Sequence, residues 1–289
     1  MTADLRFDII DVRAGVEEEN EKYAQEVRDF CNEHGIYLVN LMASPGAGKT
    51  TILCRLIDAL REDPPAGFPG TVGVIEADVD ADVDARTVAE RGAKTVQLHT
   101  GGSCHMDAAM TLRGLKALCG ENEGAGSSGS GDSIDGRDSN DSGTACPRIV
   151  FLENVGNLVC PAEFDVGADL KLMILSVPEG DDKPLKYPLM FTVSECLLVN
   201  KTDTAEVFDF DLDRCVRNVR ALNEEMPVFP LSGRTGEGFE PFVSWLRDRI
   251  EGSPKGRIAG SPNREGGRIE GAPVDRTAGY PTAESRAER

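Results

Sequence analysis

A glycine-rich segment at residues 43–50, Ala-Ser-Pro-Gly-Ala-Gly-Lys-Thr, has the composition of a loop that binds phosphate groups. Gly46 and Gly48 permit a tight turn in which backbone N–H groups converge on phosphate oxygens. Lys49 can reach the β- and γ-phosphates of a nucleotide, and the Thr50 hydroxyl can bind Mg²⁺. The segment matches the P-loop pattern except that Ala43 replaces the first glycine. The predicted phosphate-binding residues are Ser44, Pro45, Gly46, Ala47, Gly48, Lys49, Thr50 and Thr51.

A second motif, Asn200-Lys201-Thr-Asp203, favours guanine as the base of that nucleotide. The carboxylate of Asp203 can accept hydrogen bonds from N1 and N2 of guanine, a donor pair that adenine lacks. Ser232 and Gly233 open a segment similar to the loop that closes over the base in GTPases, although alanine is usual at position 233. An ordinary turn after a strand is the alternative interpretation. We therefore expect GTP or GDP to bind Asn200, Lys201, Asp203, Ser232 and Gly233.

Acidic side chains predict where the hydrolytic chemistry lies. Glu153-Asn-Val-Gly156 follows an apolar run, so Glu153 can hold the Mg²⁺ shell while the Gly156 N–H contacts the γ-phosphate. Asp78 is a second candidate for the Mg²⁺ side, although a nearby run of acids is usually a solvated loop. The predicted catalytic residues are Lys49, Thr50, Asp78 and Glu153. No glutamine or arginine is evident for positioning water or charge, so slow turnover is expected.

Cys104, His105 and Cys160 form a possible metal site of a different kind. Thiolate and imidazole ligands suit Ni²⁺, Zn²⁺ or copper rather than Mg²⁺. Spacing alone is a weak signal, because an isolated Cys-His pair is more often structural. Three ligands leave the coordination shell incomplete, so a second chain or water would have to complete it.

Composition excludes several function classes. Asp and Glu outnumber Lys and Arg by 50 to 31 in 289 residues, a net charge of −19 that opposes binding to nucleic acid or anionic membranes. No apolar stretch is long enough to span a membrane and no secretory signal is visible, so we expect a cytoplasmic, reducing location. The cysteines outside the metal set are then core or loop residues, and Cys146 is expected to be an exposed free thiol.

Short apolar runs alternate with helical patterns along the chain, which predicts an α/β, doubly wound, mainly parallel sheet. The expected strands are 36–42, 71–75, 95–98, 148–152, 170–177, 196–199 and, more weakly, 228–231. The expected helices are 17–34, one starting after Lys49, 84–92, 107–118, 211–222 and 239–250.

Three regions follow from this pattern. Residues 1–35 are expected to form a helical segment packed on the core, and residues 36–252 a nucleotide-binding domain. Residues 120–147 are rich in Gly, Ser, Asp and Asn and predict a disordered, dispensable insertion, whereas residues 253–289 predict a disordered tail.

Four segments together resemble the hydrogenase nickel incorporation GTPases of the HypB family: 42–50, 99–107, 153–161 and Ser-Val-Pro-Glu-Gly-Asp-Asp-Lys-Pro-Leu-Lys-Tyr-Pro at 176–188. The similarity runs from about residue 15 to 250, apart from the insertion. It implies a P-loop NTPase fold of the SIMIBI class of GTPases, whose members dimerise face to face across their nucleotide sites. It also maps a nickel or zinc site onto Cys104, His105 and Cys160 at the dimer interface.

The resemblance implies a GTP-hydrolysing nickel metallochaperone that supports nickel insertion into [NiFe] hydrogenase. It implies GTP or GDP, Mg²⁺ and Ni²⁺ or Zn²⁺ as ligands, and a homodimer that depends on GTP and metal. A HypA-type nickel/zinc chaperone and the hydrogenase large subunit are the expected partners. The chain departs from some members because no cysteine precedes Cys31 and no histidine precedes His34, so an N-terminal nickel store is not expected.

Three other interpretations stay open on the residues alone. The chain can be a maturation GTPase for another nickel enzyme such as urease, although the Cys160 motif and residues 183–188 argue against it. It can be a small-molecule P-loop kinase, in which case the match at Asn200 is accidental. It can also be a metal-binding scaffold with a silent nucleotide site, which the intact Lys49-Thr50 pair disfavours.

Overall fold

The computed structural model of the chain describes residues 12–68, 70–78, 83–121 and 146–258. Within these residues, seven strands form one all-parallel sheet in the order β3-β2-β4-β1-β5-β6-β7. The strands are β1 (Tyr37–Ala43), β2 (Val72–Asp78), β3 (Lys94–His99), β4 (Ile149–Glu153), β5 (Leu170–Ser176), β6 (Cys196–Asn200) and β7 (Val228–Pro230). The predicted fold class is confirmed, and the expected strands all appear with ends shifted by a few residues.

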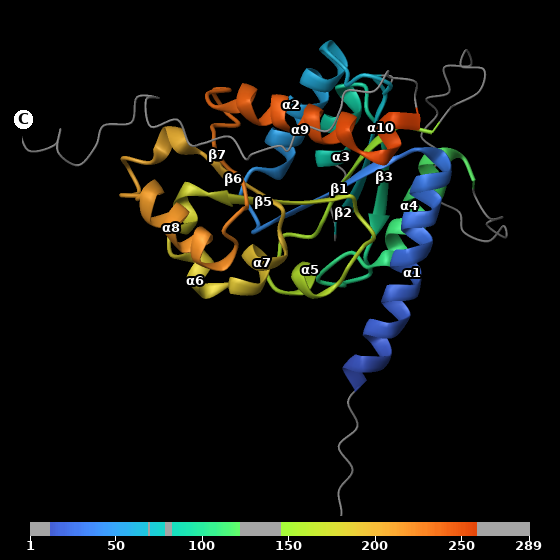
Figure 1. The fold of residues 1–289 in the computed structure, drawn as a ribbon, viewed down its shortest axis with the longest axis horizontal. Helices are drawn as coiled ribbons and strands as arrows, with labels where there is room; N and C mark the ends of the chain where they lie inside the picture. The colour runs from blue at the N-terminus through green and yellow to red at the C-terminus, as the bar shows by residue number, and fades with distance from the viewer. Residues whose placement is uncertain (1–11, 69, 79–82, 122–145, 259–289) are drawn as a thin grey trace, which may run out of the picture.

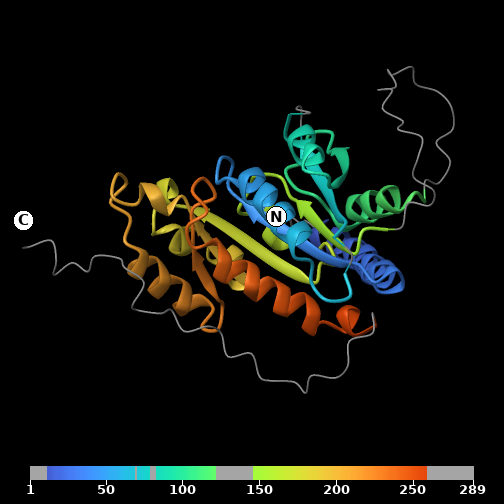
Figure 2. The same cartoon turned by 90° about the horizontal axis from the view of Figure 1, so that it is seen from above.

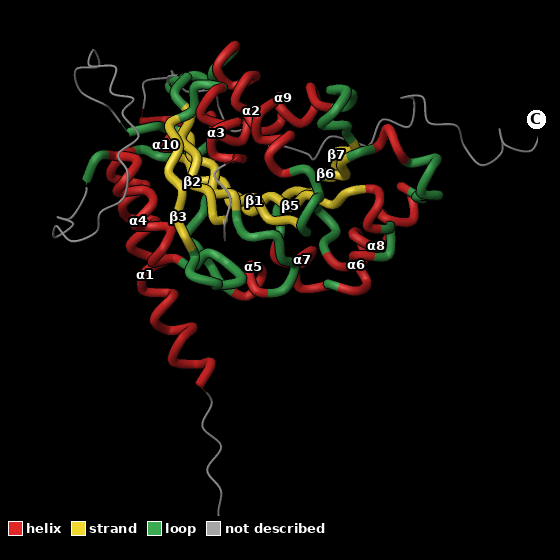
Figure 3. The backbone as a smooth tube through the Cα atoms, turned by 180° about the vertical axis from the view of Figure 1, so that it is seen from behind, coloured by secondary structure: helices red, strands yellow, loops and turns green. Residues whose placement is uncertain are grey.

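Helices cover both faces of the sheet (Figures 1 and 3). Helices α2 (Lys49–Glu62), α3 (Val83–Glu90) and α9 (Phe239–Gly252) lie on one face, and Figure 2 shows α9, in orange-red, running along the yellow strand β5. The other face carries α1 (Val12–His34), α4 (Ala108–Cys119), α5 (Cys160–Glu163), α6 (Lys183–Lys186), α7 (Pro188–Val193) and α8 (Leu212–Leu222). No described helix is both long and apolar enough to cross a membrane.

The central strand β1 shows why the sheet is covered twice. All seven of its residues are buried, and alternate side chains enter different cores. Val39 and Leu41 join the core beneath α2 and α9, while Leu38 packs with α1 and α4 and Met42 packs with α7 and α8. A strand that is apolar on both faces is stable only between two helical layers.

The first and last helices extend the domain. Helix α1 packs beside α4 through buried Val27 and Cys31. Helix α10 (Pro254–Ile258) lies inside the segment predicted as a disordered tail, so that boundary was placed too early. Its Lys255 is 5% exposed and donates to both carboxylate oxygens of Asp169, at 2.7 and 2.6 Å. The ion pair gives these residues the anchor that their composition did not reveal. Residues 259–289 lie outside the described residues.

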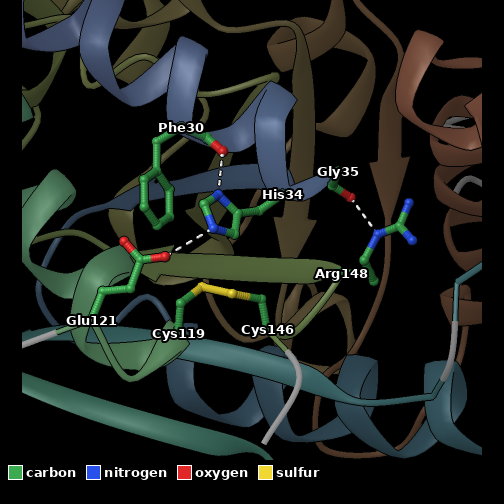
Figure 4. The surroundings of a disulfide bond; sticks show 7 residues. All are labelled: Phe30, His34, Gly35, Cys119, Glu121, Cys146 and Arg148. Atoms are coloured by element: carbon green, nitrogen blue, oxygen red, sulfur yellow. Dashed lines mark hydrogen bonds and ion pairs between the residues drawn. A yellow bond between two sulfur atoms is a disulfide. The ribbon is translucent and has the colours of Figure 1, made fainter.

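The two ends of the predicted insertion meet at a disulfide. Cys119, at the end of α4, is bonded to Cys146, just before β4, and their Cα atoms are 4.6 Å apart (Figure 4). The expectation that Cys146 is an exposed free thiol is therefore wrong. Helix α4 packs against β2 and β3, and the disulfide joins its last turn to the residues just before β4. Residues 122–145, the bulk of the insertion, lie outside the described residues.

Candidate nucleotide and metal site

The predicted site residues lie at the ends of strands. Because the strands are parallel, the loops that follow β1, β3, β4, β6 and β7 emerge at the same edge of the sheet. The loop after the central strand β1 contains the glycine-rich segment, and β4 and β5 flank β1 on either side. In sheets of this type, ligands bind at the carboxyl ends of the strands.

The phosphate loop adopts a backbone that requires glycine. Gly46 and Gly48 have φ values of 72° and 97°, in the left-handed region that other residues rarely occupy. A Cβ atom at Gly48 would lie 2.5 Å from Nδ2 of Asn200. That Nδ2 donates to the Ala47 carbonyl at 2.8 Å, and Lys201 Nζ donates to the Gly46 carbonyl at 2.7 Å. The predicted guanine motif thus holds the phosphate loop in place.

The N-terminus of α2 is open to an anion. No side chain in the described structure caps its first turn, whereas Asp107 caps α4 and Asp211 caps α8 through their carboxylates. The free N–H groups at such a helix start, together with the helix dipole, attract phosphate. Lys49 and Thr50 are half-buried in this turn, where their side-chain types suit phosphate and Mg²⁺.

The predicted base-binding region brings four predicted residues together. Ser232 Oγ donates to Asp203 Oδ1 at 2.5 Å, and the Gly233 N–H donates to Asn200 Oδ1 at 2.9 Å. Arg234, which sequence reasoning did not single out, donates to Asp203 Oδ2 from Nε at 3.0 Å and from Nη2 at 2.8 Å. The bond from Ser232, followed by that from Arg234, lowers the pKa of the Asp203 carboxyl. These bonds favour the ionised carboxylate, whose oxygens accept hydrogen bonds.

The predicted Mg²⁺ side is partly described. Glu153 ends β4 and is 8% exposed, and Glu76 of β2, which was not predicted, is its register partner and is 3% exposed. Gly156 approaches the phosphate loop so closely that a Cβ atom there would lie 2.9 Å from the Pro45 nitrogen. Asp78 is the last residue of β2, and its side chain lies outside the described residues, as do residues 80 and 82.

Cys104, His105 and Cys160 come together although 56 residues separate the two cysteines. Cys104 Sγ lies 3.0 Å from Cys160 Sγ and 3.6 Å from His105 Nδ1, and the three ligand atoms lie within 4.8 Å of one another. A soft donor set of this size fits a thiophilic divalent cation such as Ni²⁺ or Zn²⁺. Burial lowers the pKa of His105, which favours the neutral imidazole that ligates metals.

Other residues support this triad. The imidazole of His105 stacks on the Phe164 ring with centroids 4.2 Å apart, and Asn157 Nδ2 donates to the Cys104 carbonyl at 3.2 Å. The hydrogen bond with Cys104 raises the pKa of the Cys160 thiol, so a bound cation must displace protons. Asn157 could have been found from the sequence because it lies within residues 153–161, one of the segments that resemble the family. Nothing in the sequence pointed to Phe164.

This fold and loop geometry define a P-loop nucleotide-binding protein. The family model "CobW/HypB/UreG, nucleotide-binding domain" matches residues 37–230. The hydrogenase maturation factor HypB of Azotobacter chroococcum is 37% identical over 239 residues, which cover 83% of this chain and 68% of that protein. The hydrogenase/urease maturation factor HypB of Helicobacter pylori is 33% identical over 230 residues, covering 80% and 84%.

A solved structure agrees with these matches. The crystal structure of HypB from Helicobacter pylori in complex with nickel has a TM-score of 0.67 and 30% identity, covering 86% of this chain and all of that one. The chain belongs to the CobW/HypB/UreG family and, within it, to the HypB hydrogenase maturation factors. It therefore contains a nucleotide-binding domain, as the phosphate loop predicted.

Proposed function

We propose that the chain is a GTP-hydrolysing nickel metallochaperone that supports nickel insertion into [NiFe] hydrogenase. One observation carries this proposal: the segment from Glu153 to Phe164 touches both candidate sites. Gly156 lies against Pro45 of the phosphate loop, and Cys160 lies 3.0 Å from Cys104. A change in this segment when the γ-phosphate is lost would therefore alter the positions of the metal ligands.

The residues at the phosphate end have distinct roles in this proposal. Lys49 holds the β- and γ-phosphates, and the Gly156 N–H contacts the γ-phosphate. Thr50, with Asp78 and Glu153, would hold Mg²⁺, and the ion would supply positive charge to the triphosphate. The exposed edges of the loop at Pro45 and Gly46 leave room for the triphosphate.

Replacing Asp203 with asparagine should exchange the preferred base. The amide retains an acceptor for N1–H but presents a donor where guanine also donates, so GDP affinity should fall about tenfold. Xanthosine diphosphate, which has an acceptor at position 2, should bind the variant more tightly than GDP. Fluorescent-nucleotide titration measures both affinities. If the variant still discriminates between GDP and ADP as the original chain does, Asp203 does not bind the base.

The incomplete ligand set at Cys104, His105 and Cys160 is the reason for proposing a homodimer. Three protein ligands do not complete a tetrahedral or square-planar shell, so a second copy would supply the rest. Val159, which precedes Cys160, is 49% exposed, and Leu189 on the adjacent helix α7 is 45% exposed. Apolar side chains on the surface beside the ligands suit contact with a second copy. The proposed partners beyond the homodimer are a HypA-type chaperone and the hydrogenase large subunit.

Urease maturation is the second candidate function, because the Helicobacter pylori relative is named for both hydrogenase and urease. The shared metal-transfer step is tested first. Nickel affinity and oligomeric mass should be measured with GDP and with a non-hydrolysable GTP analogue, by chelator competition and light scattering. We expect a nucleotide-dependent nickel affinity and a dimer with the analogue and metal. Equal affinities and a constant mass would contradict a GTP-gated metallochaperone.

A further inference from the structure

Two asparagines join the metal loop, residues 100–107, to the segment that follows β4. Asn154 Oδ1 accepts a hydrogen bond from the Met106 N–H at 3.0 Å, and Asn157 Nδ2 donates to the Cys104 carbonyl at 3.2 Å. These bonds engage the residues immediately before and after His105. The backbone of this ligand is therefore fixed from both sides by side chains that are not themselves ligands.

The inner asparagine also reaches the strand that leads into the phosphate loop. Asn154 is 1% exposed, its Nδ2 lies 3.3 Å from Asn40 Oδ1, and its N–H donates to the Leu41 carbonyl at 3.1 Å. Asn40 and Leu41 belong to β1, which ends at Ala43. A buried amide with these partners cannot exchange them for water, so its position is tightly specified.

Met106 makes the connection stiff. Its side chain is fully buried in the core between α1, α4 and the sheet, whereas Cys104 in the same loop is exposed. The metal loop is thus buried at Met106 and exposed to solvent at Cys104. A movement of the segment after β4 would displace the loop through the bond from Asn154 to Met106 and through the bond from Asn157 to Cys104.

We propose that Asn154 and Asn157 are positioning residues for the metal ligands, and that they transmit the nucleotide state from the segment containing Gly156 to Cys104 and His105. This inference rests on the proposed function and adds the residues that couple its two sites. Partners of this kind, one bond away from the ligands, orient a metal site and typically alter its affinity about 10- to 100-fold when removed.

The test uses the full chain and Ni²⁺ alone, with GDP, and with a non-hydrolysable GTP analogue. Asn154→Ala should lower nickel affinity about tenfold and weaken the nickel–thiolate absorption band, while GDP affinity changes less than about twofold. Asn157→Ala, at a more exposed contact, should lower nickel affinity about threefold. In both variants, the ratio of the nickel affinities with the two nucleotides should move towards one.

Asn154→Asp separates positioning from general stability. The carboxylate keeps an acceptor for the Met106 N–H. Its second oxygen replaces Nδ2, which faces Asn40 Oδ1, so the Asn40 amide must turn over to donate from Nδ2, a buried donor with no partner among the described residues. This variant should keep nickel affinity within about threefold of the original chain. Asn218→Ala on α8, where the amide donates to the Asp181 carbonyl, is the control. It should leave the nickel affinity and the GDP affinity unchanged. Thermal unfolding checks that each variant folds.

Two results would overturn the inference. If Asn154→Ala and Asn157→Ala both bind nickel as tightly as the original chain, neither asparagine positions the ligands. If Asn154→Asp loses as much nickel affinity as Asn154→Ala, the acceptor at Asn154 is not what matters. The proposed function fails on a different result, in which the original chain binds nickel no more tightly than Cys104→Ala/Cys160→Ala. The inference would then fail as well. An original chain that binds nickel through these cysteines but equally with both nucleotides would overturn the transmission and, with a constant mass, the GTP gating of the proposed function. A loss of nickel affinity in Asn154→Ala would then still support the positioning role.

Discussion

Replacing Lys49 with alanine should lower GTP turnover about 100- to 1,000-fold, the cost of removing one preorganised charge donor from a phosphoryl-transfer site. The ammonium group belongs to the first turn of α2, whose open N–H groups provide the remaining attraction for phosphate. Nucleotide binding should therefore weaken less than turnover. Phosphate release and nucleotide titration on the same preparations measure the two effects.

Lys22→Ala is the matched control, because it removes an equal charge from the exposed surface of α1, where Lys22 forms an exposed ion pair with Glu18. It should leave both measurements unchanged. Turnover that survives Lys49→Ala would show that hydrolysis occurs elsewhere. Transfer of the phosphate to a small molecule, rather than to water, would support the kinase alternative.

The strands and the edge at which the chemistry lies were predictable because local composition specifies them. β1, β4 and β5 consist almost wholly of buried apolar residues, and runs of this kind are typical of parallel strands between two helical layers. Once strands alternate with helices, the loops after them must share one edge of the sheet. The sequence therefore predicts that Gly46, Gly48 and Asn200 lie near one another at this edge.

Contacts between loops were not predictable in the same way. The Cys119–Cys146 disulfide depends on where α4 ends relative to β4, which no local pattern encodes. Lys255 pairs with Asp169 across 86 residues, so its helix looked like part of a polar tail. Cys104, His105 and Cys160 could be grouped by ligand type, but their spacing in sequence is a weak signal, and the family resemblance was needed to favour a metal site. Arg234 beside Asp203 is a pairing of the same long-range kind.

Replacing Cys104 and Cys160 together with alanine should lower nickel affinity by more than about 100-fold, because it removes two of three ligands and not merely their supporting partners. The two sulfur atoms are 3.0 Å apart and come from different loops, so each loop also loses its link through the cation. Dimerisation that depends on nickel should disappear with it, while GTP turnover with Mg²⁺ but without nickel should change little. Chelator competition, light scattering and phosphate release report these three quantities.

The control for this pair is Cys119→Ser/Cys146→Ser, which removes the same number of cysteines from the disulfide and leaves the triad intact. Nickel affinity should be retained in that control. Retention of affinity in Cys104→Ala/Cys160→Ala would instead mean that the cargo binds elsewhere, since a soft cation loses most of its binding energy without thiolates. A loss of affinity accompanied by intact nucleotide binding would isolate the metal site, because the phosphate loop, Asn200 and Asp203 make no contact with either sulfur among the described hydrogen bonds.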